Sequence, residues 1–384
     1  MSLGGIIDSL RKGHLPPLGL IPDPVLDFLA GLASFRGRRF ELSTIERLLA
    51  TMRHKEPDHI PCAPLVGGAY RQLTGASFRD FSIDANVAIE AGLLGLEVIG
   101  GDVLLLGLDL TVEASDFGQA TIYPENSTAH PDYSKPLIKD HTDYRKLKRI
   151  EIKSAPRMQK VIEMSKGALK EKGLSSVFVP VVSSPLSVLA MMRGAEQVFK
   201  DCVLYPAEVM AAMETVTSVL IDYINALCDT GLIIIAPDML FASKSGLGKE
   251  LWEKMEGPFG REIAEVVHRR NCLVAIHNCG DGPCFDSMIR LMEPEAISFA
   301  CLPDDCRDRK ELKKKYGDQT TLIGNVETAL LYRGSPEQVM EECRRVIDDF
   351  AEGGGFILAP GCEYPPNANL LNAIILVQAA RIYG

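Results

Sequence analysis

Short, almost unbroken apolar runs alternate along the chain with longer segments whose apolar positions recur at helical spacing. A short apolar run ended by Gly, Pro or Asp is typical of a strand buried on both faces, whereas spacings of three and four residues predict amphipathic helices. The predicted strands are residues 60–66, 102–110, 177–182, 232–237, 273–279, 296–300, 320–326 and 356–362. Eight such strands alternating with helices predict a (β/α)8 TIM barrel.

Two segments lie outside this alternation. Residues 1–42 carry short helical patterns, and a capping box formed by Ser43 and Glu46 then signals the start of a new helix. We therefore expect an N-terminal helical extension over 1–42 and the barrel over 43–384. Residues 111–150 are polar and rich in Gly and Pro, which predicts an insertion that forms a hairpin or a lid over the barrel mouth.

Composition and charge narrow the possible partners. The 384 residues carry a formal net charge of -10, which argues against nucleic acid or an anionic membrane as the main partner. We find no signal peptide and no apolar run long enough to span a bilayer. Ten cysteines in such a chain favour a cytoplasmic location, where thiols serve as core residues or metal ligands.

The ends of two predicted strands carry soft metal ligands. His277 and Cys279 end the strand 273–279, and side chains two residues apart on a strand point to the same side. Cys362 ends the strand 356–362. An imidazole with two thiolates is the ligand set of a catalytic zinc site with its fourth position open, and thiolates disfavour magnesium or calcium. Alternatively, the two cysteines are small core residues and His277 is a hydrogen-bonded core histidine.

Other residues compete for places in this site. Cys284 lies close enough to Cys279 in sequence to replace a thiolate ligand, and Cys301 is a weaker candidate. Asp238 directly follows the strand 232–237, where a carboxylate acts as a catalytic acid or metal-site partner, or else caps the next helix. Glu363, next to Cys362, either supports the site or is simply exposed.

These residues resemble a known family. The segments 55–61, 277–280, 324–327 and 361–362 (Lys-Glu-Pro-Asp-His-Ile-Pro, His-Asn-Cys-Gly, Gly-Asn-Val-Glu and Gly-Cys) resemble the uroporphyrinogen decarboxylase superfamily. The His-x-Cys pair with the late Gly-Cys is similar to its zinc-dependent corrinoid methyltransferases, of the methylcobamide:coenzyme M methyltransferase type. The resemblance covers nearly the whole chain from about residue 44.

The resemblance implies a (β/α)8 barrel and a zinc ion held by His277, Cys279 and Cys362. In that branch zinc binds an acceptor thiol, and the thiolate attacks the methyl group of a methyl-cobalt corrinoid and leaves Co(I). The corrinoid (methylcobalamin) usually arrives on a separate corrinoid-binding protein. The implied function is therefore methyl transfer between a corrinoid protein and a thiol or tetrahydrofolate acceptor. The reverse role, demethylation of a small methylated substrate onto the corrinoid, uses the same groups.

Two departures from the family pattern bear on the substrate. The decarboxylase branch carries an Arg-Gln-Ala-Gly-Arg segment, and the nearest match here, residues 70–75, lacks the second arginine. A substrate with many carboxylates is then poorly held, which disfavours decarboxylation. An acidic residue follows the sixth strand in some methyltransferases, but here that position is Ala300, followed by Cys301, which leaves the fourth ligand open. A non-catalytic metal- or corrinoid-binding protein is the third alternative.

Overall fold

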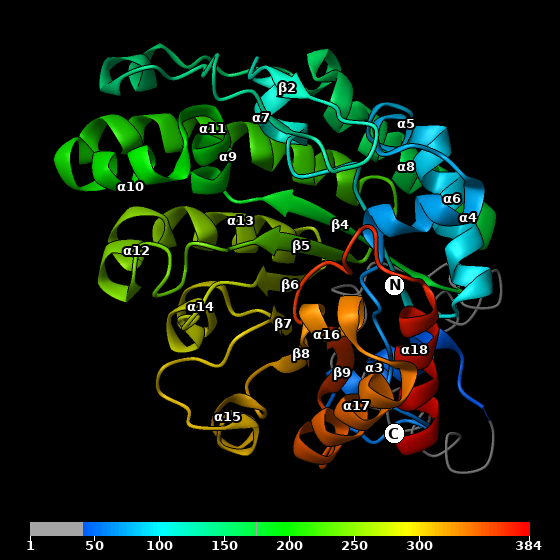
Figure 1. Ribbon diagram of the computed structural model, residues 1–384. Coiled ribbons are helices and arrows are strands. Elements are labelled where there is room, and N and C mark those ends of the chain that lie inside the picture. Colours follow the sequence, from blue (N-terminus) through cyan, green and yellow to red (C-terminus); the bar gives the residue numbers. More distant parts are fainter. Residues whose placement is uncertain (1–40, 174) are drawn as a thin grey trace, which may run out of the picture.

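The computed structural model describes residues 41–173 and 175–384 (Figure 1). Apart from its last two residues, the helical extension expected over 1–42 lies outside the described residues. No helix among the residues described is long and apolar enough to cross a membrane.

Seven parallel strands form one curled sheet in the order β1-β4-β5-β6-β7-β8-β9. The strands are β1 (Val103–Leu106), β4 (Val177–Ser183), β5 (Ile234–Asp238), β6 (Leu273–Asn278), β7 (Ala296–Phe299), β8 (Thr321–Val326) and β9 (Phe356–Pro360). Each coincides with a predicted apolar run. Their near-continuous apolar character follows from burial on both faces, since helices cover the outside and side chains fill the inside.

The predicted first strand, residues 60–66, closes the sheet into a barrel. Cys62 pairs in parallel with Leu358 of β9, and its carbonyl accepts a hydrogen bond of 2.8 Å from the N–H of Asp102, just before β1. The segment therefore lies between the two edge strands. It forms only a single bridge because the two prolines within it have no N–H to donate to a ladder. The (β/α)8 barrel is thus confirmed, with an extended segment at the first strand position.

Helices form the outer layer of the barrel (Figure 1). In the first half they are α3 (Thr44–Met52), α4 (Arg71–Thr74), α5 (Phe78–Ile83), α6 (Ala85–Val98), α7 (Val112–Asp116), α8 (Pro156–Lys172), α9 (Pro185–Arg193), α10 (Ala195–Leu204) and α11 (Pro206–Cys228). In the second half they are α12 (Lys249–Met255), α13 (Gly257–Arg269), α14 (Phe285–Met292), α15 (Arg309–Tyr316), α16 (Thr328–Arg333), α17 (Pro336–Phe350) and α18 (Leu371–Tyr383).

Local sequence explains where these helices start. Ser43 and Glu46 form the predicted capping box at α3, so that two backbone N–H groups of the first turn are satisfied by side chains. At α17, Ser335 caps the helix and Pro336 occupies its first turn, where a missing N–H costs nothing. The buried residues of α17 recur at helical spacing and face the sheet: Val339, Cys343, Val346, Ile347 and Phe350.

The predicted insertion, residues 111–150, contains a short hairpin. Strands β2 (Thr121–Ile122) and β3 (His130–Pro131) pair antiparallel, and Figure 1 shows β2 beside α7. The start of the segment, including Glu113, lines the central cavity. A role as a lid stays a prediction.

A cavity of about 240 Å³ occupies the inside of the barrel. Barrel interiors are usually filled by branched side chains, but here small residues take several inward positions, among them Ala63, Ala236 and Ala275. The space left by these alanines opens toward the carboxyl ends of the strands, where polar side chains line it. The fold therefore places a hollow apolar chamber directly against the end at which barrels carry their functional groups.

Candidate metal centre

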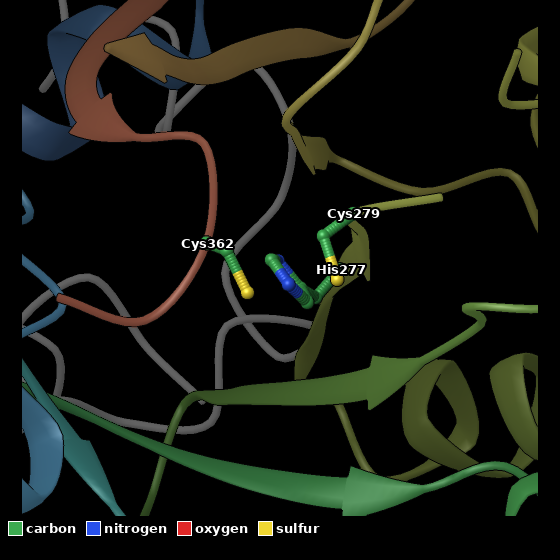
Figure 2. Close-up of side chains that lie close together, drawn as sticks. All are labelled: His277, Cys279 and Cys362. Carbon is green, nitrogen blue, oxygen red and sulfur yellow. The ribbon is translucent and has the colours of Figure 1, made fainter. Parts of the chain in front are cut away.

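Two strands that are not neighbours bring the three predicted ligands together. His277 lies near the end of β6 and Cys279 follows it, whereas Cys362 lies two residues after β9. The sheet order separates these strands by β7 and β8, so the groups meet across the barrel mouth. Their ligand atoms all lie within 4.8 Å of one another. Figure 2 shows the three side chains pointing toward one another.

A serine on the neighbouring strand orients the imidazole. Nδ1 of His277 lies 3.0 Å from Oγ of Ser298, its registered partner on β7, and Ser298 is 8% exposed. This hydrogen bond leaves Nε2 as the ring nitrogen available to a metal ion. No sequence motif singles out Ser298, although it is the single polar residue of the run 296–300.

The hydrogen bond between the two thiols shifts their pKa values in opposite directions. The hydrogen bond between Cys279 and Cys362 lowers the pKa of Cys362, and His277 lowers it further although burial opposes both. The same hydrogen bond and burial raise the pKa of Cys279. Burial on its own lowers the pKa of His277, but the neighbouring Cys362 and Asp238 outweigh it and the net shift is upward. A thiolate is therefore favoured at Cys362, and thiolate is the form of cysteine that binds metals.

Asp238 lies beside these ligands with one oxygen unused. It ends β5, in register with His277 on β6, and its Oδ1 is closed to solvent and has no hydrogen-bond partner. Burial raises the pKa of this carboxyl, and Cys362 raises it further. The next helix, α12, begins only at Lys249, so the alternative of a helix cap is excluded.

Glu363 also faces the cavity. Its Oε1 accepts a hydrogen bond of 3.0 Å from the N–H of Gly68, and desolvation by the surrounding chain, together with Cys362, raises its pKa to about 7. The backbone can approach so closely because Gly67 has φ +50 and no Cβ, which would lie 2.2 Å from Oε1. Glu363 lines the cavity and is at the same time exposed to solvent, so a role in the site stays a prediction.

The competing cysteines do not join this group. Within residues 41–173 and 175–384, the only cluster of potential metal ligands is the one made by His277, Cys279 and Cys362. Cys284 instead precedes α14, and its N–H donates to the carbonyl of Ala242.

Two further polar groups line the mouth, and no local sequence pattern singles out either of them. Glu113 accepts two hydrogen bonds of 3.0 Å from the N–H and the hydroxyl of Ser183, and burial raises its pKa. Asp109 lies 2.6 Å from Nη2 of Arg157 in a buried ion pair. These partners are far apart in sequence, so only the folded chain reveals them.

Comparisons with known proteins cover nearly the whole chain. A family model described as "Uroporphyrinogen decarboxylase (URO-D)" matches residues 43–383. A methylcobamide:CoM methyltransferase MtbA of Methanosarcina acetivorans is 24% identical over 350 residues, which are 89% of this chain and 99% of that protein. A uroporphyrinogen decarboxylase of Rickettsia massiliae is 23% identical over 81% of this chain and 87% of its own length.

One solved structure gives the fold independently. A methyltransferase from Methanosarcina mazei superposes with a TM-score of 0.76 at 21% identity, covering 88% of this chain and 98% of that one. The similarity in structure extends over almost the entire relative, so the two chains share their fold.

Proposed function

Because this chain belongs to the uroporphyrinogen decarboxylase (URO-D) family, we propose that it is a zinc-dependent methyltransferase within that family. It would move a methyl group between a corrinoid carried by a partner protein and a thiol or tetrahydrofolate acceptor. The observation that carries the proposal is the convergence of His277, Cys279 and Cys362, whose ligand atoms lie within 4.8 Å of one another beside a cavity. Similarity over nearly full length to a protein named methylcobamide:CoM methyltransferase supports it.

The residues fit a zinc ion. One imidazole and two thiolates form a known catalytic zinc set that leaves one position for substrate. Two thiolate sulfurs bound to one zinc lie roughly 3.8 Å apart in tetrahedral geometry. Ligand atoms within 4.8 Å therefore need only small side-chain rotations to bind an ion. Zinc bound there would stabilise the thiolate of an acceptor over its thiol at neutral pH and so supply a nucleophile.

The chain itself supplies orientation and a proton acceptor. Ser298 holds His277 with Nδ1 engaged, which keeps the other nitrogen toward the ligand cluster. Asp238 is the group that we assign to catalysis, because its unpartnered Oδ1 lines the same cavity and can accept the proton that an acceptor thiol releases.

Among the residues described, the cavity lacks the positive side chains that a decarboxylase of this family would need for its substrate. A substrate with several carboxylates requires cations, yet no lysine or arginine from the described part of the chain lines the cavity. Arg71 is the arginine that matches the first arginine of the decarboxylase segment. It donates to Asn367 at 2.6 Å and stacks over Phe78 instead of lining the cavity. Demethylation of a small substrate onto the corrinoid would use the same groups in reverse.

A matched pair of cysteine variants tests the proposal. Zinc analysis should give about one zinc per chain in the parent protein. Cys362→Ser should lose zinc and methyl transfer from methylcobalamin while the barrel stays folded by circular dichroism. Cys284→Ser removes a thiol outside the cluster and should keep both zinc and activity. A zinc-free parent protein that transfers methyl groups at full rate would refute the proposal.

A further inference from the structure

The cavity beside the ligand cluster continues deep into the barrel. On β5 its wall includes the last residue, Asp238, and also the first, Ile234, and on β1 it includes the first residue, Val103. A strand advances about 3.3 Å per residue and barrel strands tilt by about 36°, so the wall between Asp238 and Ile234 is about 11 Å deep. The cavity therefore reaches from the carboxyl ends of the strands to their starts.

Helix α3 forms the floor of this space. Leu48 and Met52 of α3 line the cavity, and Leu48 belongs to the same apolar cluster as Val103 and Ile234. An element that precedes the first strand position of a barrel lies at the amino-terminal end of the strands, as α3 does here. The barrel interior is thus a chamber with the ligand cluster at its mouth and α3 at its base.

The wall between mouth and floor is made of hydrocarbon. Below the layer of Asp238, His277 and Ser298, every described residue that lines the cavity inside the barrel is alanine, valine, leucine, isoleucine or methionine. A water molecule needs about two to four polar partners to be held in a cavity, and the described side chains of this wall supply none. The chemistry that fits the chamber is therefore an apolar group.

A second apolar space adjoins the same mouth, outside the barrel. Leu106 and Val161 line it and belong to the core between the sheet and the helices, whereas Ala236 belongs to the core inside the barrel. The inner space begins directly beneath the ligand cluster, because Ala275 and His277 are alternate residues of β6 that both line the cavity. A molecule whose sulfur meets the cluster would therefore extend first into the inner space.

The size of the cavity suits a chain of several carbons. The whole cavity measures about 240 Å³, and an apolar protein cavity of about 150 Å³ is enough to bind benzene. An extended carbon chain advances roughly 1.2 Å per bond, as an extended backbone does, so a depth of about 11 Å admits about nine carbons at most. The side chains of the floor occupy part of this depth, which leaves room for about six.

We propose that the sulfur compound used at this site, a thiol or its methyl thioether, carries an alkyl chain of about six carbons that lies inside the barrel with its end against α3. The inference rests on the proposed function, since it takes the bound zinc as the group that meets the sulfur. It adds the substrate class to that function, and it assigns the selection of chain length to Ala236, Ala275 and Met52.

A series of alkanethiols tests the chain. Titration calorimetry of ethanethiol, 1-butanethiol, 1-hexanethiol and 1-octanethiol into the zinc-loaded protein measures binding without turnover. The affinity should rise about tenfold for every two methylenes up to hexanethiol, because each added methylene is buried against the apolar wall. Octanethiol should gain less than threefold over hexanethiol, because its end meets α3. A rise below threefold at either of the first two steps, or of threefold or more at the last step, would overturn the inference.

Two filled variants show which apolar space holds the chain. Ala236→Leu fills the inner space, and Val161→Phe fills the space beside α8. Circular dichroism checks that both are folded. Ala236→Leu should weaken hexanethiol binding at least tenfold and keep ethanethiol within threefold of the parent, whereas Val161→Phe should change neither. Loss of hexanethiol affinity in Val161→Phe but not in Ala236→Leu would place the chain outside the barrel and overturn the inference.

A shortened floor residue gives a second test that leaves the strands untouched. Met52 is half-buried, and Met52→Ala deepens the chamber at α3. Octanethiol should then bind at least threefold more tightly than hexanethiol. Met340→Ala, at a half-buried position on α17 outside the cavity wall, should keep the order of the parent. An unchanged order in Met52→Ala would mean that the chain does not reach α3, against the proposal.

Methyl transfer from methylcobalamin to the same thiols separates the two proposals. If affinity rises with chain length as expected but no thiol is methylated, the methyltransferase assignment fails and the chain site stands. If all four thiols are methylated but bind without regard to length, the assignment stands and the chain site fails.

Discussion

Removing the hydroxyl of Ser298 should weaken zinc binding without unfolding the barrel. In Ser298→Ala the imidazole of His277 loses the hydrogen bond of 3.0 Å that fixes its ring. Partners of metal-binding histidines typically contribute tenfold to hundredfold in metal affinity, so we expect the zinc dissociation constant to rise by about that factor. The corresponding free energy is about 1.4–2.8 kcal/mol. Ser298 is only 8% exposed, so water is poorly placed to replace the hydroxyl.

The assay is a competition between the protein and a chromophoric zinc chelator, combined with urea unfolding of the zinc-free protein. Ser165→Ala is the matched control, because Ser165 is also buried but donates at 2.8 Å to the carbonyl of Val161 on α8, far from the cluster along the chain. Ser165→Ala should keep the parent zinc affinity. The reasoning is refuted if Ser298→Ala, still folded, binds zinc within twofold of the parent.

Three other perturbations have clear expected outcomes. Asp238→Asn keeps the shape of the side chain but replaces the carboxylate that accepts a proton with an amide. The zinc content should therefore persist while the methyl-transfer rate falls by about 100-fold or more. Full activity of this variant would show that Asp238 has no catalytic role. Arg47→Met should lower the free energy of unfolding by about 3–5 kcal/mol, because Arg47 is 5% exposed and its loss leaves Asp58 and Asp102 unpaired. Urea titration measures this, and a loss below about 1 kcal/mol would contradict the charge argument. The same network predicts acid sensitivity. Burial opposes the shift, but the hydrogen bond from Arg47 lowers the pKa of Asp58 below its ordinary 3.8. Its stabilisation is therefore present above pH 3.8 and is lost as the pH falls through the lower folded value, and the urea midpoint of Arg47→Met should respond less to pH in that range.

Much of the fold could be read from local patterns. Burial on both faces requires parallel strands to be continuous apolar runs, so the strands of the sheet stand out against the amphipathic helices. The exception is residues 60–66, where apolar character predicts a strand but two prolines permit only a single bridge. Local sequence reports which face is buried, whereas the hydrogen-bond ladder depends on N–H groups that proline lacks.

The same local patterns predict only part of the candidate site. His277 and Cys279 lie two residues apart on one strand, so the sequence alone predicts that their side chains point to the same side. The place of Cys362 at another strand end and the family resemblance predict that it joins the site, and the structure brings it to the other two. Their role as zinc ligands stays a prediction.

The amino-acid sequence by itself determined the order of strands and helices, the starts of α3 and α17, and the presence of soft ligands at strand ends, because each depends on residues within a few positions of one another. Only the tertiary structure decided that Ser298 holds His277, that Asp238 keeps an unpartnered oxygen, and that Arg157 is neutralised by Asp109. Closure of the barrel sets these contacts by joining residues that are tens of positions apart. The set of side chains that line the cavity is a property of that closed arrangement.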